Sequence, residues 1–159
     1  STAKTERQVT LGEQSGGQTI HRPPNGKWTL DWFFNKIRKN ILKTNNKFLN
    51  RENFKNYCKR RIVKGLDSAN IREVESMTDE LRRNKLYTNE FETVHTVLQK
   101  FRKTFGKMGM FELSMLSAFL NVNIIITRKG DEHGIFKANS DKSIHVVVDE
   151  DGGVYPMEI

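Results

Sequence analysis

The spacing of the apolar side chains changes once along this chain, at about residue 121. Before that point apolar residues recur every three or four positions, which is the period of a helix face. Leu30, Phe33, Phe34 and Ile37 are the clearest example. After it, short apolar runs separated by turn residues are typical of strands. Helices followed by a small sheet indicate an α+β domain, or a compact α/β one.

The same patterns predict where the elements lie. We expect helices over residues 30–42, 51–64, 69–83, 89–105 and 110–120, each with an apolar stripe. Strands are expected over residues 122–127, 134–137, 144–149 and 154–159, with Asp151-Gly152-Gly153 as a hairpin turn.

The length of 159 residues suits one domain with its own core. Residues 1–22 are rich in Ser, Thr, Gln and Gly and hold few core-building side chains, so we expect an extended N-terminal arm. The turn Pro23-Pro24-Asn25-Gly26 then opens a domain over residues 23–159. We expect the arm to attach the domain to a protein assembly.

Metal and cofactor chemistry are not expected. One cysteine permits neither an internal disulfide nor a thiolate cluster for zinc, and the four histidines lack ligand spacing. No Gly-rich phosphate loop or Gly-x-Ser-x-Gly elbow is present. No apolar run is long enough to span a membrane, and together with the lone cysteine this favours a cytoplasmic location.

Cys58 is the only thiol and has two interpretations. Its place on the apolar face of the helix predicted over residues 51–64 favours a buried core thiol. The alternative is a reactive thiol, because the neighbouring cations Lys59, Arg60 and Arg61 can lower its pKa.

The net charge of +8 is unevenly distributed. Residues 27–64 contain twelve Lys and Arg against two acids, whereas residues 65–159 contain twelve against fifteen. Such a basic region can bind phosphates or an acidic protein, although it is also typical of a solvated helical face. The candidates for a nucleic-acid surface are Lys36, Lys39, Lys43, Lys47, Lys55, Lys59, Arg60 and Arg61.

Three segments resemble the ovarian-tumour (OTU) family of cysteine proteases. Residues 105–126 are similar to its Trp-Gly segment, Glu-Leu helix and following strand, and the viral, nairovirus-like members are most similar over Ser114-Met115-Leu116-Ser117. The final hairpin, Asp151-Gly-Gly-Val-Tyr-Pro156, stands where that family has Gly-His-Tyr or Thr-His-Phe. Asn25-Gly26-Lys27-Trp28 resembles the family's Asp-Gly-x-Cys turn. The resemblance implies an OTU, papain-like architecture.

The resemblance to the OTU family also implies that both of the family's catalytic groups are replaced. Trp28 stands at the cysteine position and Val154 at the histidine position. The family's chemistry needs a thiolate activated by an imidazole. We therefore expect no enzymatic activity, unless the alignment of residues 23–34 is wrong, in which case a deubiquitinase stays open. Glu112 corresponds to a structural glutamate. The residues expected around the former cleft are Asn25, Gly26, Trp28, Gly106, Met108 and Tyr155.

Three functions remain, all of them binding. The first is a structural or docking domain of a viral protein or virion assembly, in the host cytoplasm or the virion. The second is RNA binding through the basic helical region, by release of counterions from phosphates. The third is ubiquitin binding without cleavage, which Trp28 disfavours because an indole would block the narrow channel for the ubiquitin tail.

Overall fold

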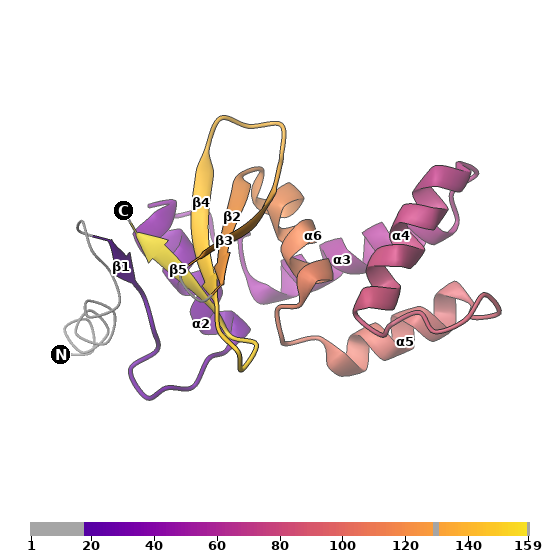
Figure 1. Cartoon of the computed structure of the whole chain (residues 1–159), viewed down its shortest axis with the longest axis horizontal. Coiled ribbons are helices and arrows are strands. Elements are labelled where there is room, and N and C mark those ends of the chain that lie inside the picture. The colour runs from indigo at the N-terminus through magenta and orange to yellow at the C-terminus, as the bar shows by residue number, and fades with distance from the viewer. Residues whose placement is uncertain (1–17, 129–130, 159) are drawn as a thin grey trace.

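A computed structural model describes residues 18–128 and 131–158 of the chain. Within these residues, five α-helices and a π-helical turn lie in sequence between the first strand of a five-stranded sheet and its other four strands. Figure 1 shows the sheet at one end of the molecule and the helices α3, α4 and α5 at the other. The predicted α+β fold class is confirmed.

Four of the described α-helices, α2 to α5, begin at polar caps, whereas α6 follows Gly109. Thr29, Asn50, Asn70 and Thr93 each accept a backbone N–H of the helix that follows, as capping residues do. The bounds are α2 Leu30–Lys36, the π-helix η1 Ile37–Ile41, α3 Arg51–Leu66, α4 Ile71–Arg83, α5 Val94–Thr104 and α6 Met110–Leu120.

The strands form one mixed sheet in the order β1-β5-β4-β2-β3. Among the pairings of the described residues, only that of β2 with β4 is parallel. The bounds are β1 Thr19–Ile20, β2 Asn123–Arg128, β3 Asp131–Phe136, β4 Ser143–Val148 and β5 Val154–Glu158.

The main hydrophobic core joins the helices to the sheet. Phe33, Phe54, Phe101, Phe111 and Ile124 are all fully buried in it, and they come from α2, α3, α5, α6 and β2. A smaller cluster around Ile20, Val147, Tyr155 and Met157 lies on the β1–β5 side. Half-buried Trp28 and Trp32 pack against both clusters.

Two predicted helices differ from the observed ones. The helix predicted over residues 30–42 changes at Ile37 into a π-helical turn, in which the Leu42 N–H donates to the Ile37 carbonyl at 2.8 Å. The helix predicted from residue 89 begins at Val94, because Thr93 caps it and the residues before Thr93 form a separate loop.

The predicted end of the N-terminal arm, at residue 22, also differs from what the structure shows. Residues 1–17 of the expected arm lie outside the described residues. Residues 18–22 were expected to belong to it, but Thr19 and Ile20 pair with Glu158 and Met157 of β5. Ile20 and His21 are buried. The described end of the expected arm is therefore an edge strand of the domain.

Among the described helices none is both long and apolar enough to cross a membrane.

Candidate functional site

The structure brings Trp28 onto the final hairpin, 126 residues away in sequence. The indole N–H of Trp28 donates to the Val154 carbonyl at 2.6 Å. Its ring lies 6.1 Å from that of Phe33, and the indole packs on the two clusters that contain Val154 and Tyr155. The two positions singled out from the resemblance are therefore adjacent, and a half-buried tryptophan occupies the space between α2 and the hairpin.

The turn before Trp28 is exposed and held by local hydrogen bonds. Gly26 has a positive φ of 73° and donates its N–H to the Pro23 carbonyl at 3.1 Å. The Asn25 side chain accepts the Lys27 N–H at 3.1 Å. Glycine suits this conformation because it has no Cβ to clash with the backbone.

Met108 lies beside the turn of the same hairpin. It lines a cavity of about 430 Å³ together with Leu113, Arg128 and Asp149. Gly106 is not among the residues that line this cavity, and it has a positive φ of 137° at the connection between α5 and α6. The six residues expected around the cleft therefore do not share one cavity.

Cys58 is a core thiol, as its position on the apolar face predicted. It is fully buried in the main cluster. Burial raises the pKa of the thiol well above its ordinary value, and the nearby Glu112 carboxyl raises it further. The adjacent cations therefore do not make Cys58 a thiolate.

Glu112 is a buried carboxyl with a structural contact. Its side chain accepts the Gly109 N–H at 2.9 Å, across the first turn of α6. Burial raises the pKa of this carboxyl, and the hydrogen bond from Gly109 lowers it by less. This agrees with the structural role that the resemblance implied.

The histidines whose side chains are described come from three different places: His21 follows β1, His95 is in α5 and His145 is in β4. His21 is buried, and its Nε2 lies 2.8 Å from a Glu158 carboxylate oxygen. His95 is exposed and His145 half-buried. In residues 18–128 and 131–158 there is no group of three His, Cys, Asp or Glu that could hold a metal ion.

The eight basic residues proposed for nucleic acid are spread over several places. Lys43 lines a cavity beside the start of β4, Arg61 lines one between α3, α4 and α6, and Lys59 and Arg60 line a groove between α3 and α5. The Lys55 ammonium lies over the Phe105 ring. None of these three sites includes Lys36, Lys39 or Lys47.

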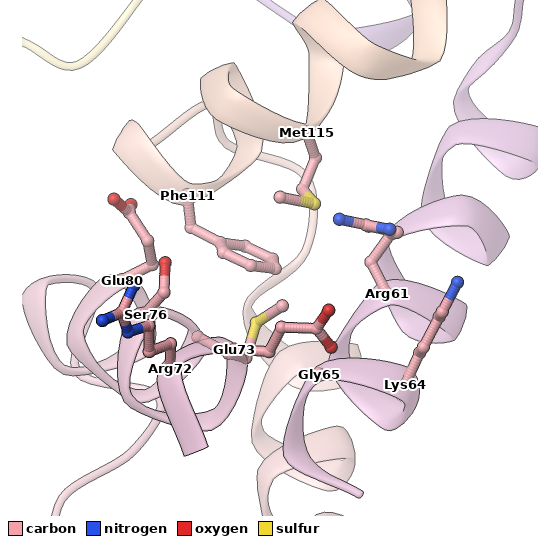
Figure 2. A pocket seen from close by; sticks show the side chains of 10 residues that line it. Arg61, Lys64, Gly65, Arg72, Glu73, Ser76, Glu80, Phe111 and Met115 are labelled. Carbon is pink, nitrogen blue, oxygen red and sulfur yellow. The ribbon is translucent and has the colours of Figure 1, made fainter. Parts of the chain in front are cut away.

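The cavity that contains Arg61 has an apolar wall and a charged rim, as Figure 2 shows. It measures about 340 Å³, with Phe111 and Met115 from α6 on one side. Charges of both signs come from α3 and α4, among them Glu73 and Glu80. This mixed lining favours no single ionic ligand.

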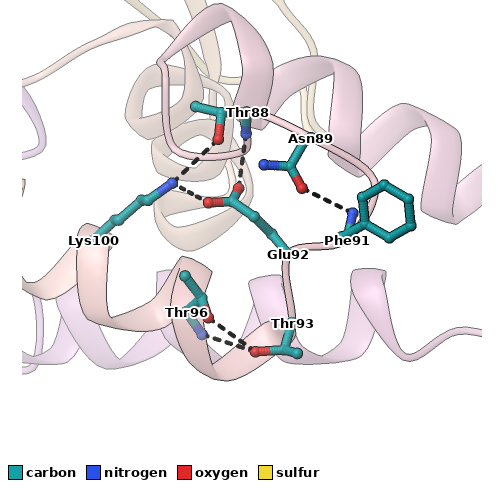
Figure 3. A network of polar contacts seen from close by, with 7 residues as sticks. All are labelled: Thr88, Asn89, Phe91, Glu92, Thr93, Thr96 and Lys100. Atoms are coloured by element: carbon teal, nitrogen blue, oxygen red, sulfur yellow. Dashed lines mark hydrogen bonds and ion pairs between the residues drawn. The ribbon is translucent and has the colours of Figure 1, made fainter.

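A loop before α5, which the sequence did not indicate, is fixed by a polar network (Figure 3). Glu92 accepts the Thr88 N–H at 2.7 Å and forms an ion pair with Lys100. The hydrogen bond from Lys100 lowers the pKa of the Glu92 carboxyl. At the tip of this loop the Phe91 N–H donates to the Asn89 side chain at 2.9 Å, and the Phe91 side chain is 86% exposed.

No family model and no curated protein match the chain. Among the solved structures that are similar to it are two OTU domains. The viral OTU domain protease from Farallon virus is 13% identical, with a TM-score of 0.48, and the match covers 89% of this chain and 83% of that one. The OTU domain of OTUD1 is 11% identical, with a TM-score of 0.44, and the match covers 99% of this chain and 95% of that one.

Both structures are OTU domains, the family that residues 105–126 resemble in sequence. One of them is a protease, and this finding contradicts our prediction that the chain is not an enzyme. That prediction is withdrawn.

Proposed function

We propose that this OTU-like domain binds another protein and that Phe91 lies at the centre of the contact. The observation that carries the proposal is the 86% exposure of the Phe91 side chain. Aromatic residues are enriched in protein interfaces and often supply much of the binding energy there. A docking domain needs such an anchor. A protease also has to bind its substrate, so the proposal does not depend on whether the partner is cleaved.

The loop around Phe91 supports the proposal because it is held in place. Glu92 is anchored to Thr88 and Lys100, and Thr93 caps α5 by accepting the Thr96 N–H at 3.2 Å. Binding through a preorganised loop loses less conformational entropy than binding through a flexible one. Phe91 therefore presents its ring at small entropic cost.

Photo-crosslinking tests this proposal. A photoreactive phenylalanine analogue replaces Phe91 in the full chain, which is expressed and irradiated in its native cells. The control carries the analogue at Asn139, which is exposed in the connection between β3 and β4. We expect a discrete protein adduct from position 91 that is absent from position 139. Equal adducts from both positions, or none from position 91, contradict the proposal.

Ubiquitin is a defined probe for the same experiment. Purified ubiquitin is added to the position 91 variant and to a second variant with the analogue at Trp28. An adduct at Trp28 identifies ubiquitin binding at the hairpin, whereas an adduct at position 91 identifies ubiquitin as a partner of the exposed loop.

A further inference from the structure

A groove runs between α3 and α5, two helices that pack against each other. It measures about 420 Å³. The residues that line it are Asn56, Lys59, Arg60, Val63 and Lys64 of α3 with Leu98 and Arg102 of α5.

These residues form one continuous stripe along each helix. On α3 they follow the spacing i, i+3, i+4, i+7 and i+8, and on α5 they are four residues apart. Nine residues of α3 span roughly 12 Å, since a helix rises about 1.5 Å per residue. The groove is therefore long enough for about two turns of a bound helix.

The lining combines positive charge with an apolar strip. Lys59, Arg60, Lys64 and Arg102 line it and no carboxylate does. None of these four cations takes part in an ion pair with a described residue. Val63 is 37% exposed between them. A ligand that neutralises the cations and covers the apolar strip gains binding free energy from both contacts.

The lining favours an acidic peptide over RNA. Single-stranded RNA is bound largely by stacking of bases on aromatic side chains, and no aromatic residue lines this groove. Val63 and Leu98 instead offer the apolar surface that an amphipathic helix covers when it lies in a groove.

We propose that the α3–α5 groove binds an acidic amphipathic helix of a protein partner. Apolar side chains of that helix cover Val63 and Leu98, and its carboxylates pair with the Lys59, Arg60, Lys64 and Arg102 side chains. The inference rests on the proposed protein-binding function and names the chemistry of one partner segment.

Fluorescence anisotropy with designed probes tests the groove. The probe is a labelled helical peptide of about 14 residues, roughly four turns, with leucines on one face and glutamates beside them. A second peptide has glutamine in place of each glutamate, and a third probe is a labelled single-stranded RNA. We expect the acidic peptide to bind at least about tenfold more tightly than the neutral one.

Matched variants locate the binding site. Arg102→Glu should weaken binding of the acidic peptide at least about tenfold, whereas Lys103→Glu, with the same change in net charge one residue away, should change it less than about twofold. Lys103 is exposed and does not line the groove. Val63→Asp should likewise weaken binding while Ile71→Asp, at another exposed apolar residue of the helices, should not. Circular dichroism confirms that each variant is folded.

Three results overturn the inference. The first is equal affinity for the acidic and neutral peptides, the second is equal effects of Arg102→Glu and Lys103→Glu, and the third is RNA binding that Arg102→Glu abolishes in the absence of peptide binding. If the peptide does not bind while position 91 still crosslinks to a protein, only the proposal for the α3–α5 groove is wrong. If both fail, the proposed protein-binding function fails as well.

Discussion

Trp28 and Trp32 lie four residues apart at the start of the first helix, yet their indole groups have different surroundings. Both are half-buried against the same two clusters. Trp28 donates its N–H to the Val154 carbonyl, whereas the buried N–H of Trp32 has no acceptor among the described residues. A hydrogen bond and an unsatisfied donor affect stability in opposite directions.

Phenylalanine at each position should separate these two effects. Trp28→Phe loses the hydrogen bond to Val154, and Trp32→Phe loses a donor that has no acceptor. We expect Trp28→Phe to lower the free energy of unfolding by about 1 kcal/mol more than Trp32→Phe does. Urea denaturation followed by circular dichroism measures both. Equal losses would show that the Trp28 hydrogen bond contributes nothing to stability.

Glu112 should make stability depend on pH. Its folded-state pKa is raised by burial, so its contribution is complete below the unfolded pKa and is lost as pH rises through the folded pKa. Glutamine keeps the oxygen that accepts the Gly109 N–H but cannot ionise. We expect Glu112→Gln to be more stable relative to wild type at about pH 8 than at about pH 4.

Urea denaturation of both proteins at the two pH values measures this difference. Subtraction of the wild-type values removes the contributions of the other titrating groups. One of these is Glu92, whose lowered pKa means that its protonation at acid pH lowers the free energy of unfolding. If the difference in the free energy of unfolding between variant and wild type is the same at both pH values, ionisation of Glu112 does not destabilise the fold.

At the scale of elements, the helix pair α3 and α4 depends on one glycine. Gly65 is buried, and a Cβ built there would lie 2.6 Å from the Met77 Cε, 2.9 Å from its Cγ and 3.1 Å from its Cβ. These distances are shorter than normal van der Waals contact, so the two helices approach closely only because residue 65 has no side chain.

Gly65→Ala should therefore destabilise the domain by about 1–3 kcal/mol through overpacking. The double variant Gly65→Ala with Met77→Ala should cost less than the sum of the two single changes, because truncation of Met77 removes its two closest atoms, Cε and Cγ. Gly134→Ala is the control, since no atom lies within 4 Å of a Cβ built there. Thermal denaturation measures the wild type and the four variants, and strict additivity would show that the overlap at Met77 is relieved in another way.

The elements themselves were largely predictable from periodicity. The helix predicted over residues 110–120 and the observed α6 coincide. Three of the four predicted strands agree with observed ones to within one residue over the described range, whereas β3 begins at Asp131, three residues before its prediction, and β1 was not predicted. The largest errors, at residues 37–41 and 89–93, fall where a π-helical turn or a side-chain network replaces regular helix. Apolar spacing carries no information on either feature.

At the scale of the whole molecule, one core makes the helices and the sheet interdependent. The main cluster contains buried residues from α2 to α6 and from β2, β4 and β5. Neither part can lose its packing without exposing the apolar surface of the other.

We therefore expect a single unfolding transition. Far-UV circular dichroism reports on the helices, and fluorescence of the two tryptophans reports on the contact between α2 and the sheet. The two signals should give the same urea midpoint. Separate midpoints would indicate that the α3–α5 end and the sheet end unfold independently.

The sequence by itself determined the α+β class, the order of the elements from α2 onward and the burial of Cys58. These features follow from the spacing of apolar residues within each element, because a helix or strand places regularly spaced residues on one face. Only the tertiary structure decided that Trp28 meets Val154, that Thr19 and Ile20 form an edge strand on β5, and that the basic residues separate into different cavities. Such contacts join residues far apart in the chain, and the packing of several elements at once determines them.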